Sequence, residues 1–328
     1  MNRRIGLSAS ALVLAVSLLV AIGLAQGQPP ASPADSKASP GPTKALADRV
    51  IVERDVEYGR AGDRKLVLDV IRPKEPAEGP LPVIVWIHGG AWRAGDKSSG
   101  SMRLAPYAAS GEYFCASVGY RLSGEAVWPA QIHDCKAAIR WLRVNAEKLG
   151  IDPERIGVWG SSAGGHLVSL LGTSGGVKKL EGDCGAPGQS SRVTCVVDFC
   201  GPSDFVTISK AREGAGRNAN GPIELLLGGT VDQKHDEAVA ASPITHVSPD
   251  DPPFLIVHGT EDSTVPIDQA ERLALALKKA GVEATFVKVQ GGGHGFGGPE
   301  VDARVRAFFA KHLQGKQVDV SGEPIEAK

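Results

Sequence analysis

A glycine-serine turn between two structured runs constrains this chain more than any other feature. Residues 156–160 are apolar and β-prone, a helix-compatible run follows, and Gly160-Ser161-Ser162-Ala163-Gly164 joins the two. This is the G-x-S-x-G pattern in a strand–turn–helix context. A turn this sharp needs small residues where strand and helix approach, which Gly160 and Gly164 supply. The pattern predicts an exposed Ser162 hydroxyl at a helix N-terminus, where backbone N–H groups can receive developing negative charge.

The turn alone leaves two interpretations open. Ser162 is either a nucleophile or an idle serine in a glycine-rich turn, and the pentapeptide by itself favours neither. The rest of the chain must decide between them.

The composition permits one large α/β domain. The chain has 328 residues and is 42% hydrophobic, so it can bury a sizeable core. Its 36 basic residues nearly balance its 37 acidic residues, and no basic stripe is apparent. We therefore expect no nucleic-acid partner.

The first 25 residues have the pattern of a secretory signal peptide. Arg3 and Arg4 precede an uncharged run over residues 9–25 that is rich in Ala, Leu and Val and ends in small residues. We expect cleavage near Ala25, a secreted or periplasmic protein, and no stable membrane association after cleavage. A retained anchor is the alternative, because the run is close to the lower limit of about 17 residues for a spanning helix.

Three further segments complete the predicted organisation. Residues 26–45 are rich in Pro, Ser and Ala and are expected to be a disordered linker, and residues 315–328 a flexible tail. Residues 46–314 are expected to form the catalytic domain. Within it, residues 203–242 are polar and glycine-rich, with a helical period only near residues 223–227, and are interpreted as a small lid insertion.

The catalytic domain alternates strand-like and helical patterns. This alternation predicts an α/β fold with a mostly parallel central sheet flanked by helices. The clearest helix is predicted over residues 129–149, with Gly150 as its C-cap.

Three residue types required for nucleophilic catalysis each follow a predicted strand directly. They are Ser162, Asp262 and His294, in that chain order. The carboxyl ends of parallel strands share one edge of a sheet, so the three side chains are expected to meet there. A serine hydroxyl needs a base to take its proton, and that base needs a carboxylate to fix its tautomer and stabilise its cation. These roles are assigned to Ser162, His294 and Asp262 respectively.

The acid has two alternatives. Asp204 also follows a predicted strand, and Glu261 precedes Asp262 in the same loop. Asp262 is preferred because its loop directly precedes the strand that leads to His294.

A second glycine-containing loop is a candidate oxyanion hole. The sequence His88-Gly89-Gly90-Ala91-Trp92 follows a continuous apolar strand over residues 82–87. Its N–H groups, from Gly89 or Gly90, are expected to bind a tetrahedral oxyanion together with the N–H of Ala163. Ala91 stands where a third glycine is common, which leaves open which amide is best placed.

Together these motifs resemble those of α/β-hydrolases of the hormone-sensitive-lipase and carboxylesterase type. The set H-G-G-A-W, Y-R-L, G-S-S-A-G-G-H, H-G-T-E-D and G-H-G-F is similar above all to the bifunctional feruloyl and acetyl-xylan esterase-like (BD-FAE-like) group. The resemblance covers residues 84–313. It implies the α/β-hydrolase fold and ester hydrolysis through an acyl-enzyme, without metal or organic cofactor.

The expected function is that of a serine carboxylic-ester hydrolase. Its substrates are expected to be acetyl or feruloyl groups of polysaccharides, or small esters. A serine peptidase or amidase of the prolyl-oligopeptidase type is an alternative within enzymes, although the region before residue 84 is too short for the propeller that such peptidases carry. A non-catalytic binding protein on the same scaffold is the alternative from another class. The sequence does not indicate an oligomeric state.

Four further residues complete the candidate list. Trp92 and Trp128 are either pocket-lining or core residues. Cys184 and Cys195 bracket a loop and form a plausible disulfide in an exported chain. No two histidines have zinc-site spacing and H-E-x-x-H is absent, so we expect no metal cofactor.

Overall fold

A computed structural model describes residues 44–211 and 221–327 of the chain. The predicted signal peptide and nearly all of the predicted linker lie outside these residues, as does the middle of the predicted lid. The described residues belong to one unit, which spans Ala38–Lys328. None of its described helices combines the length and apolar character needed to cross a bilayer.

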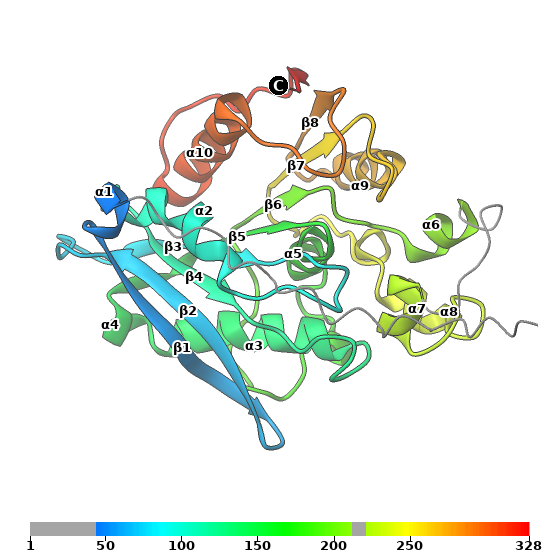
Figure 1. Cartoon of the computed structure of the whole chain (residues 1–328), viewed down its shortest axis with the longest axis horizontal. Helices are drawn as coiled ribbons and strands as arrows, with labels where there is room; N and C mark the ends of the chain where they lie inside the picture. Colours follow the sequence, from blue (N-terminus) through cyan, green and yellow to red (C-terminus); the bar gives the residue numbers. More distant parts are fainter. Residues whose placement is uncertain (1–43, 212–220, 328) are drawn as a thin grey trace, which may run out of the picture. The chain divides into compact units, whose positions relative to one another are not determined.

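One nine-stranded sheet runs through the described residues in the order β1-β2-β4-β3-β5-β6-β7-β8-β9 (Figure 1). β1 and β2 pair antiparallel, as do β2 and β4, whereas every pairing from β4 through β9 is parallel. The predicted mostly parallel sheet is confirmed. The strands are β1 (Val50–Ala61), β2 (Arg64–Pro73), β3 (Leu81–Ile87), β4 (Phe114–Val118), β5 (Ile151–Ser161), β6 (Cys195–Phe199), β7 (Phe254–Gly259), β8 (Ala284–Gln290) and β9 (Ile325–Glu326).

Helices cover both faces of this sheet. Apolar residues of α2 and α10 pack in one buried cluster, and those of α3, α5 and α9 pack in the other. The central strands are largely apolar because both of their faces are covered. The helices are α1 (Lys44–Ala47), α2 (Ser99–Ala108), α3 (Ala130–Val144), α4 (Ala146–Leu149), α5 (Ala163–Thr173), α6 (Phe205–Ala211), α7 (Pro222–Leu227), α8 (His235–Ala240), α9 (Asp268–Lys279) and α10 (Pro299–Gln314).

The helix predicted over residues 129–149 is divided in two. α3 and α4 meet at Asn145, whose side-chain amide donates to the Trp141 carbonyl at 2.9 Å. The Trp141 carbonyl also accepts the backbone N–H of Asn145, at 3.1 Å, so both donors of Asn145 bind the last turn of α3. Gly150 ends α4 with φ +67°, in the left-handed conformation expected of its predicted C-cap role.

The predicted lid contains more helix than its sequence pattern indicated. α6 and α8 form where no helical period was detected, in addition to α7. Phe205 and Ile208 of α6 are almost completely buried, and so are Ile223 and Leu226 of α7. Tertiary burial of these side chains stabilises α6 and α7, and Ala238 is the buried residue of α8. Helices this short leave little periodic signal.

The segment expected to be a flexible tail does not end as one. It ends in β9, which pairs in parallel with β8 through Val289 and Ile325. Ile325 is 4% exposed and joins the cluster that contains Phe308. A two-residue strand in a polar sequence leaves no alternating pattern to detect, so the expectation was wrong at this point.

Candidate active site

Ser162 lies at the turn between β5 and α5, with φ +58°. Both flanking glycines are required there. A Cβ atom at Gly160 would collide with the carbonyl group of Gly164, and one at Gly164 would collide with the carbonyl oxygen of Ile87. A left-handed backbone at a non-glycine residue is uncommon and clusters at functional sites, so the strained turn exposes this hydroxyl at a defined place.

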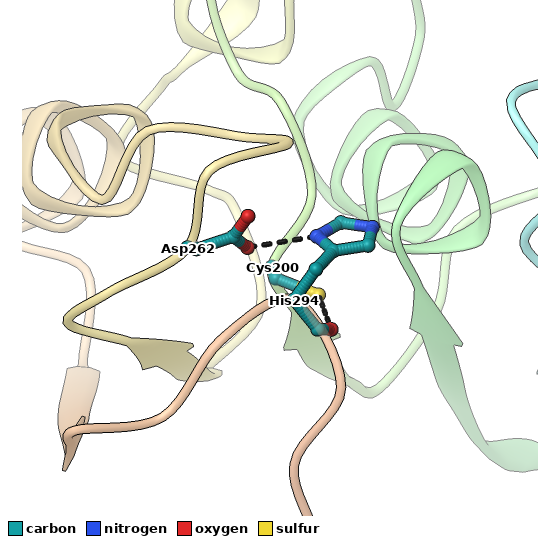
Figure 2. A group of neighbouring side chains, drawn as sticks. All are labelled: Cys200, Asp262 and His294. Atoms are coloured by element: carbon teal, nitrogen blue, oxygen red, sulfur yellow. Dashed lines mark hydrogen bonds and ion pairs between the residues drawn. The ribbon is translucent and has the colours of Figure 1, made fainter.

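His294 and Asp262 reach the same place from two other loops. The Nε2 atom of His294 lies 2.9 Å from Ser162 Oγ, and its Nδ1 atom lies 2.7 Å from Asp262 Oδ2. Figure 2 shows the His294–Asp262 pair, each residue following a different strand. The sheet edge therefore brings the three predicted side chains within hydrogen-bonding distance.

The alternative acids lie in other environments. Asp204 Oδ1 accepts the backbone N–H groups of Val206 and Thr207, both at 3.1 Å, so this carboxylate caps α6. Glu261 is exposed. Among the three carboxylates considered, Asp262 is the one hydrogen-bonded to His294.

Hydrogen bonds fix the charge of the Asp262 carboxylate. Burial acts to raise its pKa, but hydrogen bonds from His258, His294 and the N–H groups of Val265 and Thr264 lower the pKa far below its ordinary value. The Asp262 hydrogen bond is the main reason that the pKa of His294 is raised to about 10. The pair therefore favours a carboxylate beside an imidazole that readily accepts a proton.

The predicted oxyanion loop packs directly on the elbow. A Cβ atom at Gly89 would lie 2.7 Å from the Ser161 carbonyl oxygen and 3.3 Å from Ser162 Cβ. Gly90, Ala91 and Trp92 follow with φ angles of +112°, +54° and +57°. Successive residues of this kind can form a concave row of N–H groups that suits an anion. Gly89 and Gly90 thus lie beside the nucleophile candidate, as predicted from the sequence.

Ala163 completes the candidate oxyanion site from the other side. It is the first residue of α5, directly after Ser162. The first N–H groups of a helix lack intrahelical acceptors and carry partial positive charge. The Ala163 N–H is therefore suited to hydrogen-bond an oxygen bound beside Ser162.

A small cavity of about 50 Å³ adjoins Ser162. Its walls come from the oxyanion loop, the elbow, α6, α7 and the Asp262 loop. The lining residues are Ala91, Trp92, Ser162, Ala163, Pro202, Ile208, Pro222, Ile223, Thr264 and Val265. Because most of these side chains are apolar, the cavity suits a small apolar group.

Comparison with known proteins identifies the family. A family profile described as BD-FAE matches residues 68–277, which is more than half of the chain. The chain belongs to the BD-FAE family. Esterase LipC of Mycobacterium tuberculosis (strain ATCC 25618 / H37Rv) is 32% identical over 81% of the chain and 69% of its own length. LipM of the same organism, named a probable carboxylic ester hydrolase, is 34% identical over 74% of the chain and 56% of its own length.

A solved structure agrees with these sequence relatives. It is described as a truncated form of a carbohydrate esterase from gut microbiota, with 34% identity and a TM-score of 0.74. The alignment covers 84% of the present chain and 100% of that one. The BD-FAE chain therefore has the α/β-hydrolase fold, and the comparisons place it among the carboxylic ester hydrolases.

The two tryptophans proposed as pocket residues differ in position. Trp92 lines the cavity of this BD-FAE protein, whereas Trp128 is not among the residues that line it. Trp128 is 7% exposed, and its ring lies 6.2 Å from that of His166. It is therefore a packing residue.

His166 is a site residue whose role the sequence did not reveal. Its Nδ1 atom accepts a hydrogen bond from Trp92 Nε1 at 3.1 Å, and its Nε2 atom lies 2.7 Å from the Ala241 carbonyl oxygen. Burial lowers the pKa of His166 to about 4, so the ring is neutral at pH 7. It fixes the orientation of Trp92 and ties it to the C-terminal end of the lid. Its place four residues after Ser162 was the available signal.

The predicted Cys184–Cys195 disulfide is wrong, because both cysteines are free. Cys195 is in β6 and belongs to the cluster beneath α2 and α10. Cys184 packs on the cluster at the opposite face of the sheet. The sheet separates the two thiols, although only a short loop separates them in the sequence.

Proposed function

We propose that this protein hydrolyses acyl esters through a covalent acyl-enzyme on Ser162. The observation that carries the proposal is that His294 is hydrogen-bonded through both nitrogens, to Ser162 at 2.9 Å and to Asp262 at 2.7 Å. In the neutral ring, Nδ1–H donates to the carboxylate and the Nε2 lone pair faces the hydroxyl. This tautomer is the one that a general base requires.

The chemistry follows from these contacts. Ser162 Oγ attacks the ester carbonyl carbon as its proton moves to His294 Nε2, and Asp262 stabilises the resulting imidazolium. The tetrahedral oxyanion accepts hydrogen bonds from Ala163 and from Gly89 or Gly90. His294 then gives the proton to the departing alcohol. A water molecule then takes the place of the alcohol. It gives a proton to His294 as it attacks the acyl carbon, and His294 returns that proton to Ser162 Oγ as the acid leaves.

We propose acetyl groups on carbohydrates as the substrate class. Pockets for drug-sized ligands have volumes of about 300–1,000 Å³. The cavity beside Ser162 holds about 50 Å³, which suits acetyl and is small for an aromatic feruloyl group. A carbohydrate esterase among the similar structures supports a sugar as the alcohol.

The test combines one substitution with a substrate panel. We expect Ser162→Ala to lower kcat for p-nitrophenyl acetate by at least about 10⁴-fold, because the nucleophile is lost while the oxyanion site remains. Ser161→Ala is the matched control, since its hydroxyl lies 3.9 Å from the thiol of Cys200 and takes no part in the scheme. Retained activity in Ser162→Ala would reject the assignment of the nucleophile.

The panel then decides the acyl group. For the unsubstituted protein we expect kcat/KM to fall from acetyl to longer p-nitrophenyl esters, acetic acid to be released from acetylated xylan, and methyl ferulate to be hydrolysed poorly. Equal efficiency toward methyl ferulate would contradict the small-acyl proposal. Cleavage of peptide anilides in preference to esters would instead favour a peptidase.

A further inference from the structure

A buried thiol lies against the candidate triad. Cys200 directly follows β6, has φ +45° and is 1% exposed. Its Sγ atom lies 3.5 Å from the His294 carbonyl oxygen (Figure 2). The scheme of ester hydrolysis gives this side chain no task.

Cys200, Asp262 and His294 together present a metal-ligand set. One donor atom from each lies within 4.8 Å of the others. Thiolate, imidazole and carboxylate are the ligands typical of zinc, with bond lengths of about 2.0–2.3 Å. Ligands of a tetrahedral zinc site are therefore roughly 3.3–3.8 Å apart. Zinc binding would require His294 Nδ1 and Asp262 Oδ2, which lie 2.7 Å apart, to separate slightly.

No local sequence pattern indicates this cluster. Its three residues follow three different strands, β6, β7 and β8, which are neighbours in the sheet. Local spacing rules for zinc sites detect pairs within one loop or helix, so they do not register ligands that meet only at a sheet edge.

We propose that Cys200, Asp262 and His294 form an inhibitory Zn²⁺ site. The inhibitory effect rests on the proposed role of His294 as general base. The Nε2 atom faces Ser162, so an ion shared with Asp262 binds Nδ1. The Cys200 S–H bond breaks as the S–Zn bond forms, and the proton passes to water. Zinc displaces the Nδ1 proton from the imidazolium form of the ring, and that proton also passes to water. The neutral ring that remains is protonated at Nε2 rather than at Nδ1.

This change of tautomer explains how the ion inhibits. A ring with Nε2–H donates to Ser162 Oγ and can no longer accept its proton. The cavity that receives the acyl group is lined by none of the three ligands. We therefore expect Zn²⁺ to lower kcat while KM changes little.

The first experiment measures inhibition by ZnCl₂ in a buffer that does not bind metal. Each variant is normalised to its own activity without zinc. We expect Cys200→Ser to need at least about tenfold more zinc for half-inhibition than the unsubstituted protein, because a ligand is lost. Cys184→Ser, which removes the half-buried thiol outside the cluster, should keep the original midpoint. Equal midpoints in all three proteins, or no inhibition at millimolar zinc, would overturn the proposal.

The second experiment reads metal binding without catalysis. Cd²⁺ is titrated into proteins that carry Cys184→Ser, and the ultraviolet sulfur-to-metal charge-transfer band is recorded. The band should form in this background and also when Ser162→Ala is added. Adding His294→Ala should weaken the band at least about tenfold, because one ligand is lost. Adding Cys200→Ser should abolish it, because the sulfur donor is lost. A band that persists in Cys200→Ser would reject the thiol as a ligand. If Ser162→Ala retained esterase activity, the proposed function would fail while this titration still decided the metal site.

Discussion

The imidazole of His294 determines the behaviour of the site at the scale of single residues. It connects a hydroxyl on one loop with a carboxylate on another, and the thiol of Cys200 lies 3.5 Å from the carbonyl oxygen of His294 itself. The carboxylate raises the affinity of the ring for a proton, so the same contact that orients the base also sets the pH at which it is neutral.

A pH prediction follows for the unsubstituted protein and for Asp262→Asn. In the proposed scheme His294 acts as a base only when neutral, so kcat/KM should rise with pH through its raised pKa, about 10. Asp262→Asn removes the main cause of that shift and should move the rising limb toward pH 6.5, the ordinary histidine value, at a much lower maximal rate. Initial rates with p-nitrophenyl acetate, corrected for spontaneous hydrolysis, measure both limbs. Coincident limbs would show that the carboxylate does not set the pKa.

Local sequence predicted the residues of the site better than it predicted their supports. Ser162, Asp262 and His294 were recognisable because each follows a strand within a short motif. The residue that supports the site, His166, was not recognisable, because it acts through its contacts with Trp92 and with Ala241, which is 75 residues away. Such contacts depend on how the elements pack, and no local pattern encodes them.

At the scale of elements, short-range signals were reliable where burial enforced them. The apolar runs in β3 and β5 were predicted correctly because both sheet faces are covered, and α3 forms within the helix predicted over residues 129–149. Asp268 and Glu271 lie in the first turn of α9, whose N-cap residue Ile267 makes no side-chain cap hydrogen bond. These carboxylates instead bind Arg272 at 2.9 Å and Lys288 at 2.6 Å. The Arg272 contact is local to α9, whereas the Lys288 contact joins α9 to β8 and so depends on tertiary packing, as does the added helix in the lid.

β9 provides a test at this scale. Ile325→Ala should reduce the free energy of unfolding by about 2 kcal/mol, because a nearly buried side chain leaves a cavity at the sheet edge. Val318→Ala is the control, since Val318 is 38% exposed and its loss should change stability little. Urea denaturation at constant pH compares the variants. Equal midpoints would mean that the C-terminal strand does not contribute to the stability of the folded protein.

At the scale of the whole molecule, the fold follows from the alternation of strands and helices, whereas the location of the protein does not. We propose export, on the strength of Arg3, Arg4 and the uncharged run that follows. The mature protein recovered outside the cytoplasm should begin close to Gln26, as measured by intact mass and N-terminal sequencing. Recovery of the chain with Met1 intact in the membrane fraction would favour the retained anchor instead.

The cysteines have a consequence for how such a protein matures. Four of the five thiols are buried, and Cys184 and Cys195 lie on opposite sides of the sheet. The native state therefore contains no cross-link for an oxidase or isomerase to install. Recombinant production in a reducing cytosol should yield the same enzyme as production in an oxidising compartment, and dithiothreitol should leave its heat tolerance unchanged.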